Sequence, residues 1–92
     1  MVYDAKADRT ILYGGNPGGT ETWAFDYNTN TWIKLEPTEN PGGIEEHAMV
    51  YNSSTDRVIL FGGFLNGTET PSGETWIYDF NTNTWTNVSS EP

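Results

Sequence analysis

Cysteine is absent from this 92-residue chain, and basic residues are scarce. Without cysteine there are no disulfides, no thiol nucleophile and no cysteine-ligated metal. Four Lys and Arg stand against thirteen Asp and Glu, which gives a formal net charge of −9. Nucleic-acid binding depends on Lys and Arg that neutralise phosphates, so no nucleic-acid partner is expected. We interpret the charge as a source of solubility, with a cationic or metal partner as the alternative.

Long hydrophobic runs are missing as well. No stretch approaches the ~18 consecutive apolar residues of a membrane-spanning helix, so no membrane partner is expected. Residues 1–8 lack the basic and apolar regions of a secretory signal, and the sequence leaves the compartment open. Hydrophobic residues make up 35% of the chain. Because a chain of this size buries only about 60–65% of its unfolded surface, a lone monomer would be marginally stable.

What the chain does contain is an internal repeat. Residues 9–15 read Arg-Thr-Ile-Leu-Tyr-Gly-Gly, and residues 57–63 follow the same pattern 48 positions later. Residues 28–32 return letter for letter at 81–85, an offset of 53. The second repeat therefore carries a five-residue insertion after its glycines, between positions 64 and 73.

Each repeat predicts four short strands. The runs are rich in β-branched and aromatic residues, turn formers bound them, and no window has a helical period. The predicted strands are 1–3, 9–13, 22–27 and 31–35 in the first repeat, and 47–51, 57–61, 75–80 and 84–88 in the second. Four strands joined by turns within about fifty residues form an antiparallel meander.

The second strand of the second repeat is apolar on both faces. Val58 and Leu60 point one way, while Ile59 and Phe61 point the other. A sheet with one solvent-exposed face would instead alternate apolar with polar residues. The pattern predicts another sheet above and another below, and sheets stacked face to face around an axis form a β-propeller.

The order of these features resembles the kelch repeat. Each repeat has a glycine pair, an aromatic-Asp pair and a Trp seven residues after the aromatic, namely Gly14, Gly15, Phe25, Asp26 and Trp32, then Gly62, Gly63, Tyr78, Asp79 and Trp85. Phe25 departs from the family pattern, where Tyr is commoner. The resemblance implies an all-β chain of two four-stranded antiparallel propeller blades. We place blade 1 at 1–43, with a truncated first strand and the linker included, and blade 2 at 44–92.

The motif residues have structural and ligand-binding interpretations. The glycines permit a positive φ or a close approach to the next blade; a phosphate loop would need a following helix or Lys. Trp32 and Trp85 are expected to wedge between blades, with sugar stacking as the alternative. The Asp-x-Asn-x-Asn runs that begin at Asp26 and Asp79 are expected to form Asx turns, because they lack the glycine and the final acid of a calcium loop.

Two blades are too few for a closed propeller. Propellers have 4–8 blades, and repeat arrays generally need three or more units. Two blades leave two apolar faces bare, which predicts head-to-tail homo-oligomerisation into a closed ring. Three chains with six blades are favoured over two or four chains. An engineered or excised two-blade fragment is the other interpretation.

The resemblance implies a non-catalytic scaffold or protein-interaction module that contacts partners through its loops. The candidate interaction residues are Asn16, Gly18, Phe64, Leu65, Asn66, Glu45, Glu46 and His47. Phe64 and Leu65 are expected at an apolar loop tip, with packing on a neighbouring blade as the alternative. A lectin-like propeller, or one that binds a cation near His47, is the second candidate. A galactose-oxidase-type enzyme needs copper, several His ligands and a Cys, so we expect no enzyme, cofactor or metal.

Overall fold

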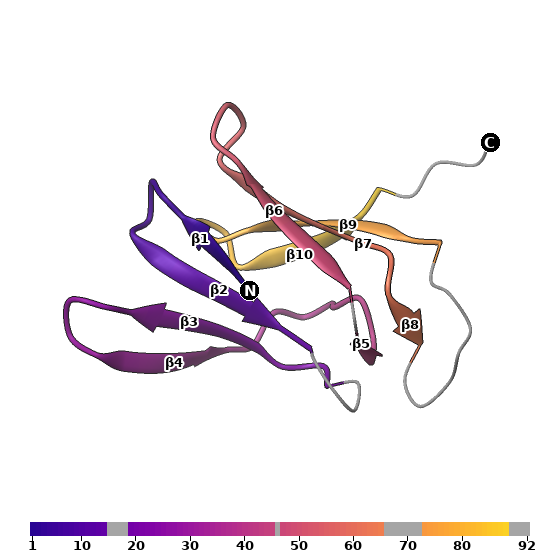
Figure 1. Cartoon of the computed structure of the whole chain (residues 1–92), viewed down its shortest axis with the longest axis horizontal. Helices are drawn as coiled ribbons and strands as arrows, with labels where there is room; N and C mark the ends of the chain where they lie inside the picture. Colours follow the sequence, from indigo (N-terminus) through magenta and orange to yellow (C-terminus); the bar gives the residue numbers. More distant parts are fainter. Residues whose placement is uncertain (15–18, 46, 66–72, 89–92) are drawn as a thin grey trace.

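The structure is a computed structural model, and it describes residues 1–14, 19–45, 47–65 and 73–88. Two four-stranded antiparallel sheets form its body (Figure 1). The first contains β1 (Val2–Asp4), β2 (Arg9–Tyr13), β3 (Thr22–Asp26) and β4 (Thr31–Leu35) in that order. The second contains β6 (Ala48–Asn52), β7 (Arg57–Phe61), β9 (Thr75–Asp79) and β10 (Thr84–Asn87). The predicted all-β chain with two antiparallel meanders is confirmed.

The strand bounds differ from the prediction by one residue at several ends. β1 and β6 each begin and end one residue later, because their ladders with β2 and β7 continue to the pairs Asp4–Arg9 and Asn52–Arg57. β3 and β9 each end one residue earlier, at an Asp whose carboxylate accepts a backbone N–H from the following turn at 3.0 Å. β10 also ends one residue early, at 87.

A third, two-stranded ladder was not predicted. β5 (Ile44–Glu45) pairs with β8 (Phe64–Leu65), so the linker lies beside the start of the insertion. The sequence places Phe64 and Leu65 on a loop tip, whereas the structure pairs both with β5. Two residues are too few to show a period-2 pattern, which is why the ladder left no signal in the sequence.

The two polar turns of each repeat are tied together by the same side chains. Asp8 takes a positive φ of 55°, accepts a hydrogen bond from the Tyr3 hydroxyl at 2.7 Å and accepts one from the Asn28 amide at 2.8 Å. Asp56 has the same φ and accepts the equivalent bonds at 2.6 and 2.9 Å. These hydrogen bonds lower the pKa of both carboxyl groups. The repeats therefore share local structure as well as sequence.

A salt bridge also recurs in both repeats. Arg9 lies 3.4 Å from Asp26, and Arg57 lies 3.4 Å from Asp79. Each Asp side chain thus accepts a hydrogen bond from a turn N–H, as an Asx turn requires, and also pairs with an Arg. Across the described residues, no group of three or more His, Asp or Glu side chains comes together as a metal site.

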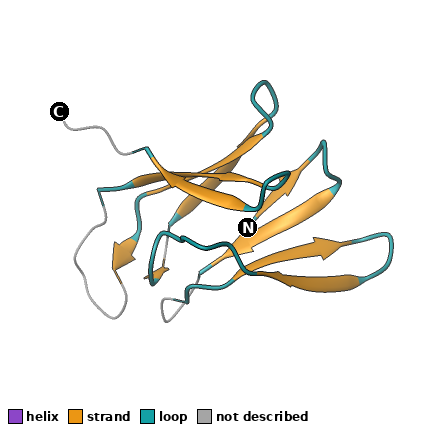
Figure 2. Cartoon of the chain, turned by 180° about the vertical axis from the view of Figure 1, so that it is seen from behind, coloured by secondary structure: helices purple, strands orange, loops and turns teal. Residues whose placement is uncertain are grey.

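The hydrophobic core lies between the two sheets, which face each other at an angle (Figures 1 and 2). Strands β1 and β6 lie side by side where the sheets approach most closely. The buried apolar side chains are Ile11, Tyr13, Ala24, Ile44, Val58, Leu60, Trp76, Tyr78 and Trp85. Within the described ranges no helix is long and apolar enough to cross a bilayer.

Candidate functional site

The interface between the sheets joins opposite faces of two equivalent four-stranded sheets. Cross-strand partners share a face, so the register assigns each side chain to one side. The first sheet buries the face that carries Ile11, Ala24 and Tyr13. The second sheet buries the face that carries Val58, Tyr78 and Trp85. In the repeat, Val58 corresponds to Thr10 and not to Ile11, so the two sheets contribute different faces.

The Trp85 side chain packs between the two sheets at this interface. Its side chain is 3% exposed, and its ring lies 5.1 Å from the ring of Tyr13 across the interface and 4.9 Å from that of Tyr78 on its own sheet. Its indole N–H donates to the Thr22 hydroxyl oxygen of the first sheet at 3.1 Å, and this bond is buried. The Trp therefore contributes both apolar contact and a specific hydrogen bond to the junction.

The outer face of the first sheet is the repeat equivalent of the face that contains Trp85. We call it the Trp32 face, and it consists of Tyr3, Thr10, Leu12, Trp23, Phe25, Trp32 and Lys34. Trp32 is 46% exposed, and its ring lies 4.8 Å from Phe25 and 6.5 Å from Trp23. The Trp23 indole donates to Glu21 at 3.0 Å. An aromatic cluster therefore lies on a face that no second sheet covers within the described part of the chain.

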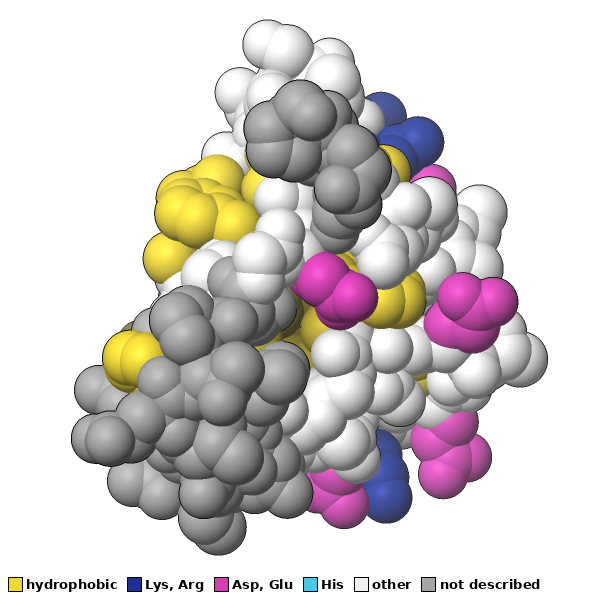
Figure 3. Space-filling view, turned by 90° about the vertical axis from the view of Figure 1, so that its right-hand side faces the viewer, with side chains coloured by type: hydrophobic (Ala, Val, Ile, Leu, Met, Phe, Trp, Pro, Cys, Tyr) yellow, Lys and Arg dark blue, Asp and Glu magenta, His cyan; other side chains and the backbone are white. Residues whose placement is uncertain are grey.

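The outer face of the second sheet is the repeat equivalent of the face that contains Tyr13. We call it the Phe61 face, and it includes Val50, Arg57, Ile59, Phe61, Thr75, Ile77 and Asp79. Phe61 is 44% exposed, whereas its counterpart Tyr13 is 2% exposed. Apolar side chains reach the molecular surface in separate patches between polar and acidic ones (Figure 3). The chain therefore presents two different apolar faces on its two outer sides.

The glycine after strand two is packed closely in one repeat and open in the other. Gly14 has a φ of +66°, and a Cβ there would lie 2.9 Å from the Ile44 carbonyl oxygen and 3.2 Å from the His47 ring. Gly62 has a φ of +75°, and a Cβ there would meet nothing within 4 Å. Gly63 also has a positive φ, of 85°. Gly14 combines a positive φ with a close approach to the start of blade 2, and Gly62 has the positive φ alone.

This difference predicts unequal costs for the same substitution. Gly62→Ala should reduce the free energy of unfolding by about 1–2 kcal/mol, the cost of a left-handed backbone in a residue with a Cβ. Gly14→Ala should cost more, because the backbone oxygen of Ile44 must also move. Urea denaturation of dilute protein measures both, with Gly62→Ala as the matched control for the backbone term. Equal losses would contradict the close packing at Gly14.

His47 lies at the same junction. Its ring meets the Tyr13 ring edge-on, with centroids 6.2 Å apart. Its Nδ1 is buried and has no hydrogen-bond partner in the described structure, and burial lowers the pKa of the imidazole. The Tyr13 hydroxyl donates to the Gly42 carbonyl at 2.6 Å, and burial raises the pKa of Tyr13 to about 12. His47 is therefore placed as a neutral packing residue between the linker and blade 1.

One motif glycine and four of the predicted interaction residues lie outside the described residues. They are Gly15 of the motif, and Asn16, Gly18, Glu46 and Asn66 of the predicted interaction residues. Glu45 lies in β5, and the backbone of Phe64 pairs with it in β8. The structure therefore gathers the predicted loop residues 45, 47, 64 and 65 around the β5–β8 ladder, away from the Trp32 face.

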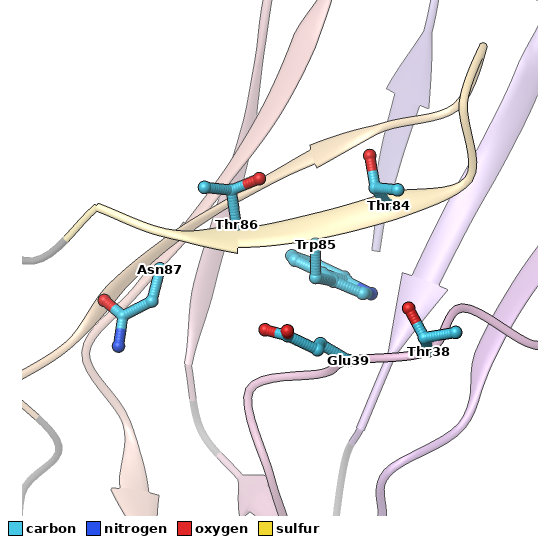
Figure 4. Close-up of a pocket in the computed structure, with 6 residues that line it drawn as sticks. All are labelled: Thr38, Glu39, Thr84, Trp85, Thr86 and Asn87. Atoms are coloured by element: carbon cyan, nitrogen blue, oxygen red, sulfur yellow. The ribbon is translucent and has the colours of Figure 1, made fainter.

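An open pocket that sequence reasoning missed lies between the linker and β10 (Figure 4). It is lined by Thr38, Glu39, Thr84, Trp85, Thr86 and Asn87. Trp85 lies between Glu39 and β10 in this view, but its burial leaves little ring surface for a ligand. The lining comes from two segments about 45 positions apart, so no local motif could have indicated it. The lining supplies one carboxylate, that of Glu39, and three Thr hydroxyl groups.

The comparison with known families matches one of these repeats. A family model described as the Kelch motif matches residues 52–90. No curated protein matches the chain. Kelch repeats are typically non-catalytic, and the motif indicates a β-propeller-type protein-interaction module. Gly62, Tyr78 and Trp85 of the second repeat fall within the matched range. The chain therefore carries a kelch motif in its second repeat, as its resemblance to the kelch-repeat family implied.

Proposed function

We propose that this chain is a two-blade, non-catalytic unit of a kelch-type β-propeller that completes its propeller by head-to-tail association with copies of itself. Residues 1–43 form blade 1 and residues 44–92 form blade 2. The assembled ring serves as a scaffold whose loops contact other proteins. The observation that carries the proposal is the equivalence between each open face and a face already buried inside the chain.

The two open faces are expected to be complementary, because each is the repeat equivalent of one side of the internal junction. The Trp32 face is the repeat equivalent of the face that blade 2 buries, and the Phe61 face is the equivalent of the face that blade 1 buries. A copy that places its Phe61 face on the Trp32 face of another copy therefore repeats the internal junction. Such a contact joins different surfaces, so it continues from copy to copy until the rotation closes a ring.

The number of blades in a closed propeller limits the number of copies of the chain in the ring. Propellers have roughly 4–8 blades, so two, three or four copies would close one. We propose three copies and six blades. The apolar content of both outer faces explains why an isolated blade pair would be a marginal monomer, since small chains bury a small fraction of their surface.

Molar mass in solution tests this proposal. Light scattering over a concentration series should give three times the 10.3 kDa mass of the chain at high concentration, with dissociation on dilution. Twice or four times that mass would change the blade number and leave head-to-tail assembly intact. A single-chain mass up to millimolar concentration would contradict the proposal.

A further inference from the structure

We infer that Trp32 and Thr75 form the specificity-determining pair of the junction between copies. The indole N–H of Trp32 would donate to the Thr75 hydroxyl of the next copy and set the register of the two faces. This inference rests on the proposed head-to-tail assembly, and it names the residues that make the assembly selective.

The internal junction supplies the precedent. Trp85 donates to Thr22 across the sheets at 3.1 Å, and the bond is buried. Trp32 and Thr75 are the repeat equivalents of these two residues, each displaced by 53 positions. Trp32 lies on the Trp32 face and Thr75 on the Phe61 face, so each copy offers the donor on one side and the acceptor on the other.

Trp32 is already held in the orientation that the junction needs. Its ring lies 4.8 Å from Phe25 with an interplanar angle of 45°. The ring of Trp85 lies 4.9 Å from Tyr78, the equivalent of Phe25, with an angle of 43°. Because the exposed indole and the buried one adopt the same pose on their sheets, little side-chain freedom would be lost on association.

Two of the sequence differences between the junctions leave this contact intact; the other differences include Ile77 for Ala24 and Thr10 for Val58. Phe61 replaces Tyr13, whose hydroxyl donates to Gly42 and not to Trp85, so the ring against the indole is retained. Phe25 replaces Tyr78, whose hydroxyl donates to Asn83 of its own turn at 2.6 Å. Both lost hydroxyl groups serve bonds within a repeat, so neither takes part in contact across the junction.

The hydrogen bond between Trp32 and Thr75 would favour a second copy of the chain as the partner, and one orientation of the two faces. A buried indole N–H without an acceptor is costly, so a surface that offers no hydroxyl at this depth binds less well. If two Trp32 faces met each other, each indole would face aromatic rings. A Thr hydroxyl has two lone pairs, so that of Thr75 can accept a hydrogen bond in addition to donating its own proton elsewhere.

The test removes the donor or the acceptor while keeping the shape. Trp32→Phe keeps an aromatic ring, and Thr75→Val keeps the volume of the side chain. We expect each to weaken association about tenfold per junction, and the double variant to be no weaker than the weaker single variant. Sedimentation over a concentration series measures association, and the far-UV circular dichroism of dilute protein should be unchanged for both variants.

Matched variants of the internal pair provide the control. Trp85→Phe and Thr22→Val make the same chemical changes inside the chain, so they should lower the free energy of unfolding and leave association of the folded chain unchanged. In the assembled protein, the Trp32 indole N–H should also exchange with solvent more slowly than in dilute monomer.

The outcomes separate the two proposals. If the unsubstituted chain stays monomeric, both the assembly and this pair are wrong. If it associates but Trp32→Phe and Thr75→Val associate equally well, the pair is wrong and the proposed assembly stands. Additive losses in the double variant would also overturn the direct hydrogen bond.

Discussion

A Trp32→Glu variant is expected to stay monomeric at concentrations at which the unsubstituted chain associates. In the proposed ring, the new carboxylate would be buried against the Phe61 face, where Arg57 already pairs with Asp79 at 3.4 Å. An unpaired buried charge costs several kcal/mol, so association should weaken at least about a hundredfold. The monomer should still fold, because the Trp32 side chain is half exposed and lies on the edge strand β4. Sedimentation velocity and circular dichroism measure the two effects separately.

The matched variant blocks the opposite face. Phe61→Glu should also be monomeric alone, because its carboxylate would be buried against the aromatic rings of the Trp32 face, where Lys34 already pairs with Glu21 at 3.2 Å. An equimolar mixture of the two variants should form a dimer, because the intact Phe61 face of one variant can pair with the intact Trp32 face of the other. Their remaining faces are blocked, so the dimer cannot grow. A mixture that stays monomeric would contradict head-to-tail pairing.

Trp85→Ala is expected to lower the free energy of unfolding of dilute protein by about 3–5 kcal/mol, the usual loss for a fully buried large aromatic. The substitution would leave a cavity beside Tyr13 and remove the hydrogen bond to Thr22. Small domains are stable by only about 5–15 kcal/mol, so much of the chain could unfold at ordinary temperature. Urea denaturation followed by circular dichroism measures the loss.

Trp32→Ala is the control for this comparison. The five residues that end at each Trp are identical in the two repeats, so the preferences of the turn before each Trp change equally in both variants. We expect a loss near 1 kcal/mol or less in dilute monomer, because Trp32 is packed on its own sheet alone. Equal losses for the two variants in dilute monomer would contradict the observed difference in burial.

The strands and turns could be read from the sequence because their causes are local. Arg9–Tyr13 and Arg57–Phe61 were predicted with their observed bounds, since a β-branched run ends at glycines that must take a positive φ. The turn residues Asp26 and Asp79 were likewise predictable, because an Asx turn forms within a few residues. The family match over residues 52–90 agrees with the motif recognised there.

Other features had no local cause. The β5–β8 ladder pairs residues about twenty positions apart over two residues each, and the pocket beside Trp85 joins the linker to β10. Both arise where the linker packs against a segment distant in the sequence. No periodicity or short motif records such a contact.

The sequence by itself determined that each repeat makes a four-stranded antiparallel sheet with apolar residues on both faces. It could not determine which face of each sheet is covered. Trp32 and Trp85 end the same five-residue sequence, yet one is 46% exposed and the other 3% exposed. The tertiary structure decided this difference, because burial depends on the sheet that packs opposite each Trp, and local sequence carries no information about that neighbour.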